Sequence, residues 1–274
     1  MSAARSISAG GGPIALRGVV ALHLGLLVAL PLAALAWKGV SHGPSAFWGY
    51  VSQPAAYDAL VRTLWTSALV AVVNGVMGTA TAWVLVRGRF RGRGVLSALV
   101  DLPFAIPTLV TGIMLVLLFG PQTALGGWAA AHGFPIAFAA PGIILALLFV
   151  TLPLVVRAVE PVLRELDPAE EEAAYTLGAG SFRTITRVVL PPLLPAIGAG
   201  ALQTFARAVA EFGSLVVVSG NVPFQTLTAP VQIFGQVESG NPEAAAAVSL
   251  VLLAIALALS FATRALRTGG GRHA

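Results

Sequence analysis

The longest run of residues without a charge most constrains what this chain can fold into. Residues 102–156 contain no Asp, Glu, Lys or Arg, and neither do residues 18–37 or 63–86. A helix needs roughly 20 consecutive, mostly apolar residues to cross about 30 Å of hydrocarbon. Only 10% of the residues are charged, whereas soluble domains carry about 25%. Because so few charges cannot cover a soluble surface, the chain is predicted to lie in lipid.

The apolar runs predict an all-α membrane protein with six transmembrane helices. The run 102–156 is too long for one helix, and Gly- and Pro-containing segments interrupt it at 120–128 and 132–135. The expected spans are about 17–37, 62–86, 99–119, 139–157, 193–219 and 244–264. They form a permease domain, 17–266, between an N-terminal tail, 1–16, and a C-terminal tail, 267–274. The first run exceeds the 7–15 apolar residues typical of a signal peptide, so we expect residues 1–36 to be retained.

Basic residues alternate between the connections, and this alternation predicts the orientation. Lys and Arg gather on the cytoplasmic side of a membrane. Residues 87–93 hold four arginines, whereas 120–138 and 219–243 hold no Lys or Arg. Lys38 and Arg62 are a weak exception in the first outer connection. Both termini are therefore predicted to be cytoplasmic. The net charge of +5 follows this pattern, so nucleic acid binding is not expected.

Residues 158–191 form the one long charged connection, between the fourth and fifth spans. Asp167 is a favourable N-cap and Pro168 suits the first helical position, so a short helix is predicted to begin here. Gly178 permits a sharp change of direction, after which Ser181 is expected to cap a second helix that enters the membrane. On these grounds alone, the loop could also be an ordinary amphipathic linker.

A specific spacing within this loop resembles the EAA loop of type I, binding-protein-dependent ABC importer permeases. The positions that fill the pattern are Glu172, Ala173, Ala174, Gly178, Val188, Leu190 and Pro191. The resemblance implies a MetI-like fold in which the first short helix couples to a dimer of cytoplasmic ATP-binding subunits. Glu172 would then contact the ATPase, Ala173 and Ala174 would keep the docking surface small, and Gly178 would set the angle to the next helix.

Two further segments are similar to the T-type permease subunit of sulfate/thiosulfate importers. They are DLPFAIPTLVTG at 101–112 and RAVAEFGSLVVVSGN at 207–221, together with the arginine-rich segment 87–94. Val209-Ala210 departs from the Leu-Gly pair that relatives often carry. The resemblance implies transport of sulfate or thiosulfate, a second permease subunit in a heterodimer, and a periplasmic or extracellular sulfate-binding protein. A homodimer, and a permease for molybdate, tungstate or another oxyanion, remain alternatives.

Ionisable and helix-breaking residues within the spans are candidates for the translocation path. Arg207 and Glu211 lie one helical turn apart in the fifth span. Ionisable residues at such a depth pair with each other or face a polar cavity, so they form either a structural ion pair or an anion contact. Pro103 and Pro107 each remove a backbone donor. With Thr108 they mark either simple kinks or a lining of the path.

The remaining residue patterns argue against an enzyme. The chain has no cysteine, which excludes disulfides and thiolate chemistry. No Gly-rich phosphate loop ending in Lys-Ser or Lys-Thr occurs, so a partner must hydrolyse ATP. We expect no catalytic residue, no cofactor and no metal site. A secondary transporter driven by an ion gradient is the alternative of another class, but it predicts more spans or an inverted repeat and leaves the EAA spacing unexplained.

Overall fold

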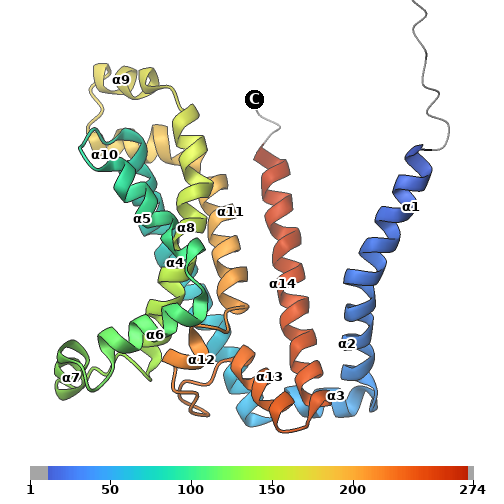
Figure 1. Ribbon diagram of the computed structural model, residues 1–274. Helices are drawn as coiled ribbons and strands as arrows, with labels where there is room; N and C mark the ends of the chain where they lie inside the picture. Colours follow the sequence, from blue (N-terminus) through green and yellow to red (C-terminus); the bar gives the residue numbers. More distant parts are fainter. Residues whose placement is uncertain (1–11, 271–274) are drawn as a thin grey trace, which may run out of the picture.

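The computed structural model describes residues 12–270, and every regular element within that range is helical (Figure 1). This confirms the all-α prediction. α1, Gly12–Leu24, continues through a π-helical turn, Gly25–Ala29, into α2, Leu30–Val40. The outermost parts of the expected tails, 1–11 and 271–274, lie outside the described residues, as does part of the segment 1–36 that we expect to be retained.

Five helices within the described range are long and apolar enough to cross a membrane, and one bent pair makes a sixth candidate. Most of the long segments begin with a proline in the first turn, where its missing N–H and fixed φ cost nothing. They include α4, Pro54–Arg87, α8, Ala140–Glu165, α11, Leu190–Val209, and α14, Pro242–Gly270. Short helices connect them: α3, Gly43–Val51, α7, Ala124–Ala131, α12, Leu215–Val218, and α13, Ala229–Glu238.

α4, α8 and α11 pack together as the centre of the bundle. Small residues let their backbones approach closely, as is common between membrane helices. A Cβ added at Gly200 of α11 would lie 3.0 Å from the Cα of Val155 on α8. Asn74 of α4 donates to the hydroxyl of Thr151 on α8 at 2.8 Å and to the carbonyl of Leu148 at 3.1 Å. Close packing therefore joins α11 to α8, and the two hydrogen bonds of Asn74 join α4 to α8.

The expected third span is broken, and here the structure differs from the sequence-based boundaries. In place of one helix over 99–119 there are two: α5, Arg93–Ala105, and α6, Thr108–Phe119, at an angle of 111°. The residue before a proline is driven out of the helical region, and Ile106 accordingly has φ −86° and ψ 125°. Pro107 is also extended, with ψ 134°. Together they separate the two helices.

The expected fifth span is displaced. A continuous helical segment runs from α10, Ser181–Thr184, through a π-helical turn, Ile185–Val189, into α11. It ends at Val209, ten residues before the expected end at 219. A turn at 210–214 then leads to α12. The segment therefore begins in the cytoplasmic loop of the prediction and ends inside the expected span.

The ends of the long helices divide the molecule into two sides. Figure 1 shows α9, Pro168–Thr176, at one end of the bundle, and α3, α7 and α13 at the other. The beginning of α1 and the end of α14 lie on the same side as α9. This arrangement agrees with an even number of crossings between them.

The close packing of α4 on α8 predicts different effects for two neighbouring glycines. A Cβ at Gly78 would lie 2.7 Å from the Cβ of Val155, whereas one at Gly75 has its nearest neighbour, the Cβ of Ala201, at 4.0 Å. Both substitutions to alanine gain the same helix propensity, but overpacking costs about 1–3 kcal/mol. We expect Gly78→Ala to be less stable than Gly75→Ala by that difference in detergent unfolding experiments. Equal stability of the two variants would contradict this packing.

Candidate functional site

The loop between α8 and α11 begins with a helix whose ends are both locally determined. At its start, the Asp167 carboxylate accepts a hydrogen bond from the Ala169 N–H at 2.9 Å, and Pro168 occupies the first helical position. At its end, the Gly178 N–H donates to Tyr175 O, and the Ala179 N–H donates to Ala174 O. These two bonds form a Schellman motif, which requires a left-handed residue after the C-cap. Gly178 has φ +82°, so it makes the turn that the sequence predicted.

The expected cap of the second helix is wrong. We expected Ser181 to be the N-cap, but the N-cap is Gly180, and no side chain caps this end. Gly180 is extended, with ψ 163°, and its carbonyl accepts the Thr184 N–H at 3.0 Å. Ser181 is therefore already the first helical residue, where its hydroxyl no longer has the geometry of an N-cap.

α9, the turn at Gly178 and the helix that follows form an elbow. The residues of the EAA pattern lie on the surface of this elbow or close beneath it. Glu172, Ala173 and Pro191 are exposed, while Ala174, Val188 and Leu190 are half-buried. Next to the last positions of the pattern, the buried side chains of Val189 and Leu193 belong to one hydrophobic cluster with Val159 and Leu163 of α8. The C-terminal half of the pattern is thus anchored to the bundle.

An ion pair that was not predicted from the sequence links α9 to the bundle. Arg87, the last residue of α4, places its Nη2 2.8 Å from Glu171 Oε1 and donates to Leu166 O at 3.1 Å. Both charged side chains are mostly buried, 21% and 18% exposed. The neighbouring Glu170 and Glu172 point to solvent. On the sequence alone, Arg87 was used only for the predicted orientation and as part of the arginine-rich segment 87–94. The sequence feature that could have indicated this ion pair is the run of three glutamates at 170–172 in a chain whose connection 87–93 is rich in arginine.

A second feature lies at the C-terminal end of α11, next to the break between α5 and α6. Arg207 and the α5–α6 break line a cavity of about 330 Å³. Four of the five residues proposed for the translocation path therefore come together: Arg207, Pro103, Pro107 and Thr108. The other lining residues are Phe104, Ile106, Val150 and Leu154. The fifth candidate, Glu211, does not line the cavity.

Glu211 lies behind Arg207 and is almost completely buried, with 1% of its side chain exposed. Its Oε2 lies 2.6 Å from Nη1 of Arg207, and its Oε1 accepts the N–H and the hydroxyl of Ser214, both at 3.0 Å. The carboxylate is therefore satisfied on both oxygens. Arg207 keeps 40% of its side chain exposed and lines the cavity, so this side chain is both paired and accessible.

The beginning of α6 contributes to the same cavity. Pro107 is its N-cap and provides no side-chain cap. The first N–H groups of a helix lack partners within it and give this end a partial positive charge. A Cβ at Gly213 would lie 2.3 Å from Thr108 Oγ1, so the turn that holds Glu211 is pressed against the start of α6. Arg207 and a positive helix end thus lie close together.

No group of three or more His, Cys, Asp or Glu side chains in residues 12–270 has an arrangement that could hold a metal ion. His132 places its Nδ1 2.8 Å from the Trp128 carbonyl, and its ring lies 4.5 Å from the Trp128 ring. Its contacts are those of a packed side chain at the end of α7.

Comparison with known proteins places this geometry among importer components. Residues 74–268 match the family described as binding-protein-dependent transport system inner membrane component. The sulfate transport system permease protein CysT of Synechocystis is 42% identical over 256 residues, which cover 93% of this chain and 90% of that protein. CysT of Escherichia coli is 38% identical over 256 residues, covering 93% and 92%.

Solved structures share the fold at low sequence identity. A chain of a bacterial alginate ABC transporter, in complex with an alginate pentasaccharide-bound periplasmic protein, has a TM-score of 0.75 and 17% identity, covering 91% of each chain. A chain of the MetNI methionine ABC transporter in inward-facing conformations has a TM-score of 0.57 and 21% identity, covering 79% of this chain and 98% of that one. These likenesses confirm the expected permease fold.

The Arg87 contacts predict a measurable change in α9. Arg87→Gln removes the ion pair with Glu171 and weakens the hydrogen bond to Leu166 O, which together are worth about 1 kcal/mol, or roughly fivefold in local opening. We expect amide hydrogen exchange over residues 168–176 to accelerate by that factor. Arg89→Gln, at an exposed arginine two residues on, is the control and leaves the exchange unchanged. The same exchange rate in both variants would show that Arg87 does not hold α9.

Proposed function

The chain belongs to the family of binding-protein-dependent transport system inner membrane components, and from this membership we propose that it is the T-type permease subunit of a sulfate/thiosulfate ABC importer. The observation that carries the proposal is similarity along nearly the whole chain to relatives named as sulfate transport system permeases. The segments 101–112 and 207–221, which are similar to that subgroup, border the cavity beside Arg207.

The chain is a multi-pass membrane protein and is not itself an enzyme, because permease subunits of this family leave ATP hydrolysis to a separate subunit. An ATPase and a binding protein are therefore its partners. More specifically, we propose a dimer of ATP-binding subunits, a second permease that forms a heterodimer with this one, and a periplasmic or extracellular sulfate-binding protein. Both termini would lie on the cytoplasmic side of the inner membrane, together with α9.

α9 is proposed to dock on the ATPase. Glu172 supplies a polar contact, and Ala173 and Ala174 leave room for the helix to seat deeply. Leu177, 88% exposed, adds an apolar side chain at the end of the same surface. Support comes from the continuous helical segment that follows the elbow at Gly178: it runs from Ser181 to Val209 and carries Arg207 in its last turn. Because a helix is stiff along its axis, movement of the elbow is passed to the cavity.

The cavity beside Arg207 is proposed as part of the anion path. A divalent anion needs positive charge or aligned donors, yet it must also leave. Arg207 provides the charge, and the start of α6 at Thr108 adds a positive helix end. Glu211 neutralises part of the arginine charge and holds one of its nitrogens, so the attraction for an anion stays weak. Pro103 and Pro107 create the break that opens this space.

Transport of radiolabelled sulfate by the reconstituted complex tests the function. The chain is purified with its ATPase, second permease and binding protein and placed in liposomes. We expect uptake that requires ATP and is inhibited by unlabelled sulfate and thiosulfate, with little inhibition by molybdate at the same concentration. Stronger inhibition by molybdate would assign the complex to the other oxyanions. Uptake that follows an ion gradient without ATP would reject an ABC importer.

Arg207→Ala tests the path. Loss of a charge-assisted contact of about 1.5–3 kcal/mol should lower sulfate uptake roughly tenfold or more, with assembly and binding to the ATPase intact. Arg62→Ala is the matched control, because Arg62 forms an i,i+4 pair with Asp58 at 3.0 Å but does not line the cavity. Normal uptake by an assembled Arg207→Ala complex would leave the Arg207–Glu211 pair a purely structural role.

A further inference from the structure

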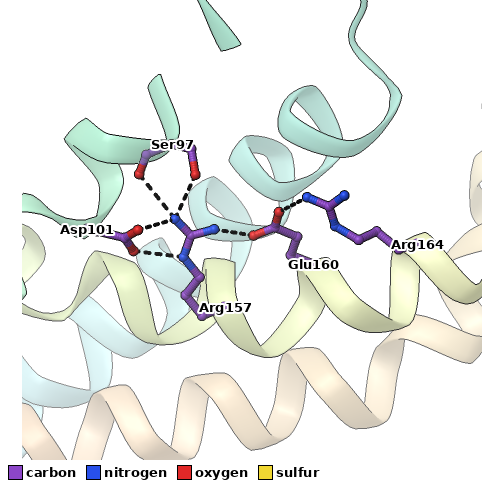
Figure 2. Close-up of polar contacts among 5 residues, drawn as sticks. All are labelled: Ser97, Asp101, Arg157, Glu160 and Arg164. Atoms are coloured by element: carbon purple, nitrogen blue, oxygen red, sulfur yellow. Dashed lines mark hydrogen bonds and ion pairs between the residues drawn. The ribbon is translucent and has the colours of Figure 1, made fainter. Parts of the chain in front are cut away.

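A cluster of polar side chains joins α5 to α8 near the cavity (Figure 2). Arg157 of α8 forms a bidentate pair with the carboxylate of Asp101 on α5. Its Nε donates to Oδ1 at 2.8 Å and its Nη2 donates to Oδ2 at 2.6 Å. Nη2 also donates to the carbonyl of Ser97 at 3.1 Å and to its hydroxyl at 2.9 Å. Bidentate pairs of this kind are strong and fix orientation as well as distance.

The remaining side of Arg157 is held within its own helix. Nη1 donates to Glu160 Oε2, and Arg164 donates to the other oxygen of the same carboxylate. Glu160 is buried, with 8% of the residue exposed. The cluster contains two arginines and two carboxylates, so its formal charge is zero. Each nitrogen of the Arg157 guanidinium already has a protein acceptor.

The cluster lies next to the cavity on both helices. On α8, Val150 and Leu154 line the cavity, and Arg157 follows them on the same helical face. On α5, Asp101 lies three residues before Phe104, which also lines the cavity. Beyond Arg157, α8 continues to Glu165 and leads into α9. The cluster therefore lies between the cavity and the loop between α8 and α11 that carries α9, which is the proposed coupling loop.

α5 has few other attachments to the bundle. Its buried residues are Val100 and Pro103, whereas Val95, Leu99 and Phe104 are exposed. It is bounded by Gly92, at φ +96°, on one side and by the bend to α6 on the other. A short helix with a change of chain direction at each end needs a further link if it is to move with its neighbour.

We propose that Arg157 is a positioning residue that locks α5 to α8, so that both walls of the cavity move as one body when the coupling loop is displaced. The inference rests on the proposed coupling of α9 to an ATPase. A second anion site at Arg157 is disfavoured by the geometry, because Asp101 and Glu160 would repel an anion and occupy the donors that it needs.

A pair of spin labels tests the lock in the complete complex. The chain has no cysteine, so Leu99→Cys on α5 and Glu165→Cys on α8, both at exposed positions, provide a single labelled pair. In the parent complex we expect one narrow distance distribution, the same without nucleotide and with bound ATP. Arg157→Gln should broaden it and make it depend on ATP, and should lower sulfate transported per ATP hydrolysed roughly tenfold.

Arg164→Gln is the matched control. It removes the same charge from the same helix, but Arg164 is 53% exposed and its ion pair is with Glu160 on α8 itself. We expect it to keep the narrow distribution and the parent ratio of transport to hydrolysis. Asp101→Asn, which keeps the shape of the side chain while removing its charge, should reproduce the effect of Arg157→Gln and covers the case in which that variant assembles poorly.

Unchanged distances and an unchanged transport ratio in Arg157→Gln and Asp101→Asn would overturn the lock. Lower uptake with unchanged distances would also overturn it, in favour of an anion contact at Arg157. The distance measurement needs ATP and the ATPase but no transported anion. If the parent complex prefers molybdate, the proposed substrate is rejected. The lock between α5 and α8 is still tested, because the distance measurement does not depend on the transported anion.

Discussion

Backbone groups without partners are costly in hydrocarbon, and this constraint explains where the cavity lies. Two helices break within the bundle, and the breaks meet. At the first break, Pro107 lies between α5 and α6 and leaves no free N–H, because proline has none. At the other break, the Glu211 carboxylate accepts the N–H of Ser214. The turn around Gly213 then packs on the start of α6 at Thr108. The two breaks thus lie side by side, next to a cavity that Arg207 lines.

Two continuous helical segments connect this cavity with the coupling loop. α8 enters the loop and carries Val150 and Leu154 on the cavity wall; the segment from Ser181 to Val209 leaves the loop and carries Arg207. Gly178, in its Schellman motif, fixes the angle between α9 and the second segment. The ion pairs of Arg87 and Arg157 add side-chain links to α9 and α5. The proposed docking of an ATPase on α9 would therefore act on both sides of the cavity at once.

The sequence predicted the features that depend on local rules or on composition. Uncharged runs indicated membrane helices, and Asp167-Pro168 indicated the start of α9, because capping involves only neighbouring residues. It did not predict the 111° bend, since two prolines are compatible with a mild kink as well as a complete break. Ser181 was misjudged because the preceding turn places Gly180 at the cap. The α5 partners of Arg157, Asp101 and Ser97, lie 56 and 60 residues away in the sequence, and no local pattern indicates them.

Site-specific photo-crosslinking of the assembled complex tests the central claim, that α9 is the part of the chain on which the ATPase acts. A photoreactive residue replaces Ala173 in α9 or, as a control, the exposed Leu125 in α7, at the opposite end of the bundle (Figure 1). We expect a crosslink from position 173 to the ATP-binding subunit and none from position 125. A crosslink to that subunit from position 125, with none from 173, would contradict it.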